Sequence, residues 1–451
     1  MGAGRLQPHP YQQEAIEFLS GANRHCGDDC GLGKTLIAIE VGARFKGPKL
    51  IVCNSKAKSQ WFNAILQQQP SAKISMASIG GMNSVNWTDM IANRPDMWYI
   101  IHWEGVVRQV LVLHKVLWDL VILDEAHKIR NRGIQRARAC KVLQASHKIT
   151  LSATDMEKDP RDFWSIFNFL DPKAFPSYHK FCDNFFILVG KGWGGSHYMG
   201  IYESRKEEFA KLLSTYIIRR TKLQVAPQLP PKIFTTVPIE LSAAERVWYN
   251  KIAKQTIVEI TPADFDIGVY EPTELFVNGA LARTVRLHQA ALDCALLGMP
   301  GAPSSKRDWI LEWLEDNPDE VVVILSVYRE FAIELSKHLK CALVVGSSSS
   351  KGLDRWLDGE ERVLVGTIAS VGESLNLQRA GTLIFANQHR SATTMAQAID
   401  RVHRINITEP KNIITLQAQH TIDVHIAKAL TKKWGEREAL YDLLKQWNDY
   451  N

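Results

Sequence analysis

The sequence contains no long apolar run and no apolar leader at its start. No stretch among its 451 residues approaches the ~18 apolar residues of a membrane-spanning helix, so we expect no membrane partner. Cysteine is scarce: the seven residues are odd in number and widely scattered, which argues against a disulfide framework and favours a reducing compartment. These absences predict an intracellular, cytoplasmic protein.

A strong charge of one sign, internal repeats and low-complexity tracts are also missing. Lysine and arginine total 54 against 48 acidic residues, and the net charge of +6 is compatible with a polyanionic partner but too mild to establish one. With 45% apolar and 23% charged residues, the composition is that of a globular protein and excludes a collagen or a wholly disordered chain. Because one hydrophobic core rarely grows beyond ~250–300 residues, we expect two domains.

Short apolar runs alternate with helical patterns in both halves of the chain. Uninterrupted runs suit strands that are buried on both faces of a parallel sheet, and their alternation with helices predicts an α/β fold. The runs are 50–53, 98–101, 120–123, 149–151, 321–325, 343–345, 363–365, 383–385 and 413–416. The predicted domains are 1–225, with a helical insertion at about 155–225, and 226–451, with a helical insertion at about 240–300; the proline-punctuated stretch 226–231 marks their junction.

A glycine-rich turn leads directly into the first of these helical patterns. Gly31 and Gly33 let successive backbone N–H groups converge on phosphate oxygens at the positive end of the helix dipole. Lys34 would reach the β- and γ-phosphates, and Thr35 would offer its hydroxyl to Mg²⁺. Asp28 stands where the full pattern has glycine, and the alternative is a chance Gly-Lys-Thr turn.

Two adjacent carboxylates follow the apolar run 120–123. Asp124 is placed to hold Mg²⁺ through water, and Glu125 is placed to polarise an attacking water molecule. The alternative is an acidic cap on a helix. That alternative explains the two acids but not the nucleotide loop upstream, so the pair favours hydrolysis.

A third element lies in the second half of the chain. Arg401 and Arg404 are three residues apart and therefore share one face of a predicted helix. A planar guanidinium suits the charge that develops on a γ-phosphate, and in comparable sites such an arginine contributes roughly 10³–10⁵ in turnover. A solvated basic helix face is the alternative, and the hydrolytic motifs in the same chain favour the catalytic interpretation.

Together these residues resemble the SWI/SNF-type DNA translocases, which are helicase-like ATPases of helicase superfamily two. The resemblance covers nearly the whole chain, and its most specific parts are the Trp-Ser segment 162–172 and the double-arginine, double-proline junction 218–232. Neither segment belongs to superfamily-two ATPases in general. The other matching segments are 10–14, 29–35, 119–127, 151–154, 366–377 and 397–405.

The resemblance implies two RecA-like lobes that clamp ATP with Mg²⁺ and move on duplex or branched DNA as a monomer, with little sequence preference. It further implies that Gln12 recognises the base, that Gly372 contributes to the nucleotide site, and that 151–154 couples hydrolysis to DNA. The expected contacts to the DNA backbone are Ser55, Lys56, Lys128, Arg130, Ser326 and Thr367. Six cations without an acid occupy 128–141, although a solvated helix face would carry such a run equally well.

Several residues depart from the family pattern beside its motifs, namely Asp155, Met156, Ser374 and Asn406, and they bear on coupling efficiency more than on ATP hydrolysis. We expect a compact bacterial, archaeal or viral enzyme of replication, repair, recombination or defence. A strand-separating DNA or RNA helicase is one alternative. A nucleotide-regulated DNA scaffold with negligible turnover is another.

Overall fold

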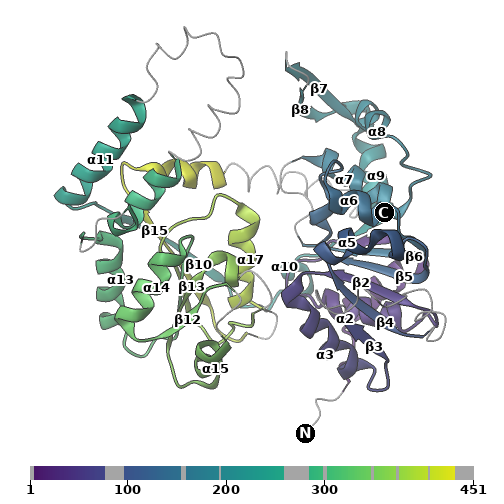
Figure 1. The fold of residues 1–451 in the computed structure, drawn as a ribbon, viewed down its shortest axis with the longest axis horizontal. Helices are drawn as coiled ribbons and strands as arrows, with labels where there is room; N and C mark the ends of the chain where they lie inside the picture. The colour runs from purple at the N-terminus through teal and green to yellow at the C-terminus, as the bar shows by residue number, and fades with distance from the viewer. Residues whose placement is uncertain are drawn as a thin grey trace. The chain divides into compact units, whose positions relative to one another are not determined.

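The fold is given by a computed structural model that describes residues 5–76, 96–153, 159–191, 195–258, 284–297, 302–346, 350–371, 375–404 and 407–431 (Figure 1). These residues form two compact units that divide between 228 and 229, inside the proline-punctuated stretch. Each unit is described by itself below.

The first unit is built on a seven-stranded parallel sheet in the order β3-β4-β2-β5-β6-β1-β9. Its strands are β1 (Arg24–Cys26), β2 (Lys49–Cys53), β3 (Ile74–Met76), β4 (Trp98–His102), β5 (Leu117–Asp124), β6 (Gln144–Leu151) and β9 (Ile217–Ile218). The four apolar runs predicted in this half all lie within strands. The sequence pattern did not indicate β3 or β9, and it gave β1 only weakly.

Alternate residues of β5 divide between two hydrophobic clusters, so both faces of the sheet are buried. Val121 and Leu123 belong to one cluster, with residues of α5 (Trp103–Leu113) and α6 (Gln135–Lys141), whereas Leu120 and Ile122 belong to the other. That second cluster includes α1 (Pro10–Gly21), α2 (Lys34–Gly42) and α3 (Lys58–Gln68). This double cover explains why the strands read as continuous apolar runs.

A phenylalanine-rich cluster forms the remainder of the first unit. Phe163, Phe167, Phe181, Phe186 and Phe209 are all buried in it. Its elements are α7 (Phe163–Leu170), α8 (Tyr178–Phe185), the antiparallel hairpin β7 (Phe186–Lys191) and β8 (Gly195–Ile201), α9 (Lys206–Tyr216) and α10 (Lys222–Val225).

The second unit has a six-stranded parallel sheet in the order β10-β15-β14-β11-β13-β12. Its strands are β10 (Lys232–Ile239), β11 (Val322–Ser326), β12 (Ala342–Val344), β13 (Val363–Thr367), β14 (Thr382–Phe385) and β15 (Lys411–Ala418). Its helices are α11 (Ala243–Val258), α13 (Ser305–Asp316), α14 (Arg329–Leu339), α15 (Ser350–Asp358), α16 (Ile368–Val371) and α17 (Ala392–Val402), and 284–292 and 422–431 are also helical.

The alternation of β11 again shows a sheet buried on both faces, because Val323 and Leu325 enter one cluster while Val322 and Ile324 enter another. The predicted α/β class with parallel sheets is therefore confirmed. Among the helices in the described ranges, we find none with the length and apolar character that crossing a bilayer requires.

Candidate functional site

The predicted catalytic segments of the first unit meet at one edge of its sheet. Strands β2, β5, β6 and β1 are consecutive neighbours and run parallel, so the segments that follow them leave at the same, carboxyl edge. In a parallel α/β sheet this edge is where ligands bind. The segments are the glycine-rich loop at 27–33, the short 3-10 helix Ser55–Ala57, the acidic pair at 124–125 and Ser152.

The glycine-rich loop has the backbone that its sequence requires. Gly31 and Gly33 have φ angles of +88° and +77°, in the left-handed region, and Gly33 is the residue that precedes α2. A Cβ on Gly33 would lie 2.3 Å from Nε2 of Gln12, so a side chain at this position would have to displace the Gln12 amide. The left-handed backbone therefore favours glycine at both positions, and the loop leads directly into the N-terminus of α2, the end of a helix that attracts phosphate.

Lys34 opens α2, and its side chain contacts its own loop. Its Nζ donates to the carbonyl oxygens of Asp28 at 2.6 Å and Asp29 at 3.2 Å. Thr35 is the second residue of the same helix. A triphosphate would offer Lys34 stronger acceptors than these neutral carbonyls.

Gln12 lies beside the loop rather than in open solvent. It is 4% exposed; the His9 backbone N–H donates to its Oε1 at 2.9 Å, and its Nε2 donates to the Leu32 carbonyl at 3.0 Å. The hydroxyl of Tyr11 donates to the same carbonyl at 3.2 Å. The segment expected to recognise the base thus also braces the phosphate loop, and base recognition by Gln12 stays a prediction.

Asp124 ends β5 in an environment that disfavours its charge. Burial and the negative charge of Glu125 raise the pKa of Asp124 to about 6, against the opposing effects of the Trp61 indole and the Lys34 ammonium. The indole Nε1 of Trp61 donates to Asp124 Oδ2 at 2.9 Å. The carboxylate of Asp124 and the hydroxyl of Thr35 are hard oxygen donors of the kind that Mg²⁺ prefers, so their chemistry fits that ion.

Glu125 is held in an unusual backbone conformation and linked to the next motif. Its φ of +57° is left-handed, which is rare for a residue with a side chain and costs about 1–3 kcal/mol. Its Oε2 lies 3.3 Å from Nδ1 of His127, and the same nitrogen lies 3.2 Å from Oγ of Ser152. His127 thus connects the acidic pair to the segment expected to couple hydrolysis to DNA.

The aspartate that replaces the expected glycine has a specific partner that sequence reasoning missed. Asp28 is fully buried, and Arg220 Nη2 lies 2.5 Å from its Oδ2. Position 28 therefore holds one half of a buried ion pair. The family-specific double arginine at 219–220 was the available signal, but nothing in the sequence pairs it with residue 28.

The predicted DNA contacts of the first unit fall on neighbouring segments. Ser55 is exposed at the start of the short helix after β2. Lys56 follows it, with a side chain outside the described part. Lys128 Nζ donates to Oδ1 of Asn54, which joins the two segments, and Arg130 follows the 3-10 helix Ala126–Ile129.

The other cations of 128–141 are partly engaged within the unit. Arg136 pairs with Glu104 at 2.8 Å, and Arg132 lies 4.0 Å from the ring of Tyr178. Lys141 lies 4.2 Å from the ring of Trp164, and its burial lowers its pKa to about 8. This run is therefore not a uniform solvated face.

In the second unit, Ser326 and Thr367 end the adjacent strands β11 and β13 but turn their hydroxyls inward. Ser326 is 1% exposed and donates to Oδ1 of Asn387 at 3.2 Å; Thr367 is 7% exposed and shares a 2.6 Å hydrogen bond with Ser370. Contact of either hydroxyl with DNA would require a local rearrangement and stays a prediction.

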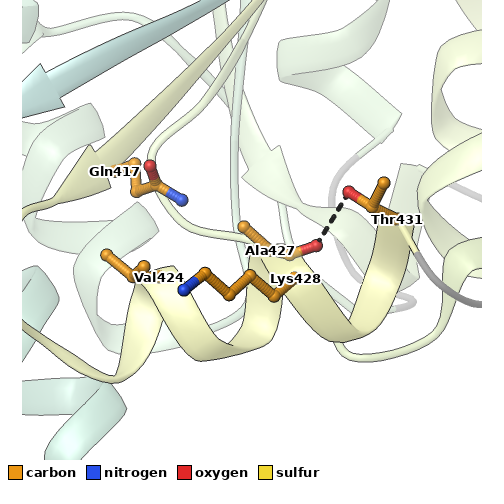
Figure 2. A pocket seen from close by; sticks show the side chains of 5 residues that line it. All are labelled: Gln417, Val424, Ala427, Lys428 and Thr431. Carbon is orange, nitrogen blue, oxygen red and sulfur yellow. Dashed lines mark hydrogen bonds between the residues drawn. The ribbon is translucent and has the colours of Figure 1, made fainter.

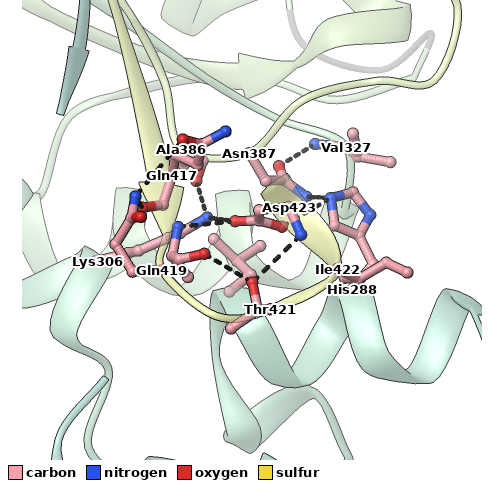
Figure 3. A network of polar contacts seen from close by, with 12 residues as sticks. His288, Lys306, Val327, Ala386, Asn387, Gln417, Gln419, Thr421, Ile422 and Asp423 are labelled. Carbon is pink, nitrogen blue, oxygen red and sulfur yellow. Dashed lines mark hydrogen bonds and ion pairs between the residues drawn. The ribbon is translucent and has the colours of Figure 1, made fainter. Parts of the chain in front are cut away.

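A buried polar network supports the turn after Ser326 (Figure 3). Lys306 lies 2.5 Å from Asp423 and also donates to the Ala386 carbonyl at 3.0 Å. Asn387 lies 3.3 Å from Nε2 of His288 and accepts from the Val327 N–H at 2.9 Å. Burial lowers the pKa of His288 to about 4, against the charge of Asp423.

Arg401 lies on α17, but the helix ends at Val402 and His403 is extended, so Arg404 follows the helix and the prediction that the two arginines share one helix face was wrong. Arg404 Nη2 donates to the Leu375 carbonyl at 2.8 Å, and the Arg401 carbonyl accepts from the Leu377 N–H at 3.1 Å. Both arginines belong to the second unit, whereas Lys34 and Glu125 belong to the first.

Gly372, Asp155, Met156, Ser374 and Asn406 lie outside the described residues. A shallow groove of about 520 Å³ opens beside the helix 422–431, lined by Gln417, Val424, Ala427, Lys428 and Thr431 (Figure 2). None of the predicted site residues lines it.

Each of the two units is an α/β unit with a parallel sheet. The first carries a phosphate loop and an acidic pair, and the second carries an arginine-bearing helix. This combination defines a helicase-like ATPase. The chain belongs to the SNF2-related family: the model of the SNF2-related domain matches residues 11–285, and that of the helicase conserved C-terminal domain matches 305–406.

The relatives include longer proteins of several kingdoms. The human SWI/SNF-related matrix-associated actin-dependent regulator of chromatin subfamily A member 1 is 23% identical over 93% of this chain and 42% of its own length. A putative ATP-dependent helicase/translocase of Bacillus subtilis, YwqA, is 24% identical over 94% of this chain and 48% of its length. The chain thus spans less than half of these relatives. Among solved structures, the Sulfolobus solfataricus SWI2/SNF2 ATPase core in complex with dsDNA aligns with a TM-score of 0.47 and 22% identity, covering 98% of this chain and 97% of that chain.

Proposed function

We propose that this protein is an ATP-dependent DNA translocase of the SWI/SNF type, which uses ATP hydrolysis to move on duplex or branched DNA in replication, repair or recombination. The observation that carries the proposal is the carboxyl edge of the first sheet, where the glycine-rich loop and the acidic pair leave the sheet together: the Lys34 ammonium favours the charged form of Asp124, and the Glu125 carboxylate favours the charged form of Lys34. Family membership supports it, as does the helicase/translocase designation of the Bacillus relative.

The residues of the first unit would divide the chemistry among them. Lys34 would leave the carbonyls of its loop and bind the β- and γ-phosphates. Glu125, oriented through His127, would accept a hydrogen bond from the attacking water. Asp124 and Thr35 would hold Mg²⁺, which neutralises phosphate charge when it is bound with ATP.

The second unit would supply the positive charge that the transition state requires. Arg401 and Arg404 are the candidates, because a guanidinium can contact two phosphate oxygens at once. Since the first unit holds the loop and the acidic pair, neither unit alone would be competent, and hydrolysis would depend on their engagement with one nucleotide.

The DNA-binding role is supported by the segments at 54–56 and 128–130, which Lys128 joins through Asn54. Contacts from these cations and hydroxyls to phosphate would carry no base information, so binding would be largely independent of sequence. It would weaken as salt rises, because each neutralised phosphate releases counterions.

The deciding experiment measures steady-state ATP hydrolysis with single-stranded, duplex and forked DNA and with RNA. We expect severalfold stimulation by duplex or forked DNA that declines with added salt. A flat response would reduce the proposal to a general ATPase, and strand separation of the fork would favour a helicase.

Glu125→Gln distinguishes an ATP-hydrolysing translocase from a nucleotide-regulated DNA scaffold. We expect it to bind ATP normally with turnover nearly abolished, while the matched variant Glu17→Gln, whose side chain is 60% exposed on α1, behaves as wild type. Negligible turnover in the wild-type protein, with retained nucleotide-dependent DNA binding, would support the scaffold instead.

A further inference from the structure

The chain that connects the two units is tied to the phosphate loop by a dense set of contacts. Arg220 donates three hydrogen bonds to the carboxylate of Asp28. Its side-chain Nε and its backbone N–H donate to Oδ1 at 3.1 Å and 2.9 Å, and its Nη2 donates to Oδ2 at 2.5 Å. Arg219 Nη2 lies 3.2 Å from Oδ1 of Asp29, and the backbone N–H of Lys222 donates to its Oδ2 at 3.2 Å. The Asp29 N–H in turn donates to the Arg220 carbonyl at 3.0 Å.

One of these contacts pairs a buried negative charge, the carboxylate of Asp28, with Arg220. Asp28 is 0% exposed, and an unpaired carboxylate at such a depth is strongly destabilising. The carbonyl of the same residue accepts from Lys34 at 2.6 Å, so this carboxylate lies close to the place where a triphosphate must bind. Without Arg220, the negative charge of Asp28 would destabilise the loop and repel an incoming phosphate.

Arg220 also reaches the segment that braces the loop from the other side. Its guanidinium lies 5.3 Å from the ring of Tyr11 and donates to the Tyr11 carbonyl. The hydroxyl of Tyr11 donates to the Leu32 carbonyl within the loop at 3.2 Å. Arg220 therefore supports the loop directly at residue 28 and, through Tyr11, at residue 32.

The carboxyl-terminal end of the connecting segment, 219–232, contacts the arginine-bearing helix of the second unit and the residue that follows it. Nε2 of His403 lies 2.7 Å from the Pro230 carbonyl, and Lys232 Nζ lies 3.4 Å from Oδ1 of Asp400. His403 and Asp400 flank Arg401. The segment 219–232 thus contacts the phosphate loop at its start and the arginine helix at its end.

We propose that Arg220 is a positioning residue for the phosphate loop: by neutralising Asp28 from the junction, it keeps the loop able to accept a triphosphate. The proposal rests on the proposed nucleotide-binding function. It assigns to the connecting chain a part in the ATP site beyond that of a tether. It also explains why this loop carries aspartate in place of glycine, since a glycine would leave Arg220 without its carboxylate partner.

The test compares Arg220→Gln, Asp28→Asn and their double variant for ATP affinity by equilibrium binding and for the separate values of KM and kcat. Arg220→Gln should weaken ATP binding by about tenfold or more, because it leaves a buried charge unpaired beside the phosphate site. Asp28→Asn in the same chain should restore affinity to within about threefold of wild type, because it removes that charge. Arg44→Gln, which breaks the exposed pair with Glu17, is the control and should change nothing.

A second readout does not depend on nucleotide. Hydrogen exchange of the loop amides at 27–33 in the ATP-free full-length protein should be faster in Arg220→Gln and slow again in the double variant, while the amides of β2 stay protected in all of them. Wild-type ATP affinity and loop protection in Arg220→Gln, or a double variant as impaired as the single one, would overturn the proposal. Absence of ATP binding by the wild type would instead refute the proposed function, and hydrogen exchange would still decide the role of Arg220.

Discussion

His127 and Ser152 share a hydrogen bond of 3.2 Å at the carboxyl edge of the first sheet, and His127 also lies 3.3 Å from Glu125. A conformational change at Ser152 can thus reach Glu125, the carboxylate that we propose orients the attacking water. We predict that Ser152→Ala lowers stimulation of ATP hydrolysis by DNA several times more than it lowers turnover without DNA. Assays with and without duplex DNA check this, and an equal fall in both rates would contradict the coupling role.

Gly33→Ala should abolish ATP binding. The substitution adds a Cβ 2.3 Å from Gln12 Nε2 at a backbone φ of +77°, so both the loop and its brace must shift. The matched control is Gly190→Ala, where a Cβ would meet nothing within 4 Å. Equilibrium nucleotide binding compares the two variants. Normal affinity in Gly33→Ala would mean that the loop does not bind phosphate in the conformation described.

Trp61→Phe should lower kcat by about tenfold to a hundredfold and raise the Mg²⁺ concentration required for half-maximal activity, since a lost hydrogen bond to a charged group is worth about 1.5–3 kcal/mol and about 1.4 kcal/mol is tenfold in rate. The reason is that the indole donates to Asp124 at 2.9 Å and fixes its orientation. Phenylalanine keeps most of the buried surface, so a thermal melt should show whether the fold is retained. An unchanged Mg²⁺ dependence would show that Trp61 does not influence the proposed Mg²⁺ site.

His288 predicts how stability depends on pH. Its folded-state pKa of about 4 lies below the ordinary 6.5, so the unfolded chain binds more protons and stability falls as pH decreases through the window from 6.5 to 4. The full loss is on the order of 3 kcal/mol. Urea unfolding of the wild type and His288→Gln at pH 7 and pH 5 checks this. The variant should lose less stability on acidification, and parallel losses would contradict the assignment.

The sequence was sufficient for the parts of the fold that are locally encoded. The strands β2, β4, β5 and β6 read as apolar runs because both their faces are buried, and Lys34, Asp124 and Glu125 follow patterns that have few structural alternatives. The strand β1 was hard to recognise because Arg24–Cys26 is only three residues long and depends on β6 and β9 for its pairing.

Contacts between distant charges could not be predicted in the same way. Asp28 and Arg220 are far apart in the sequence, and each has many residues of opposite charge to choose from. Only the pairing of β1 with β9 brings them together, because Cys26 aligns with Ile218. The inward hydroxyl of Ser326 depends in the same way on Asn387. Tertiary pairing of this kind leaves no periodic signal in the sequence.

The central claim is that a single ATP is hydrolysed with charges from both units, and Arg404→Gln tests it most directly. We predict a fall in DNA-stimulated kcat of at least about 10³-fold, with ATP affinity within about threefold of wild type, because the proposed phosphate-binding residues belong to the first unit and the proposed transition-state charge to the second. Turnover that remains at the wild-type level in this variant would contradict the account.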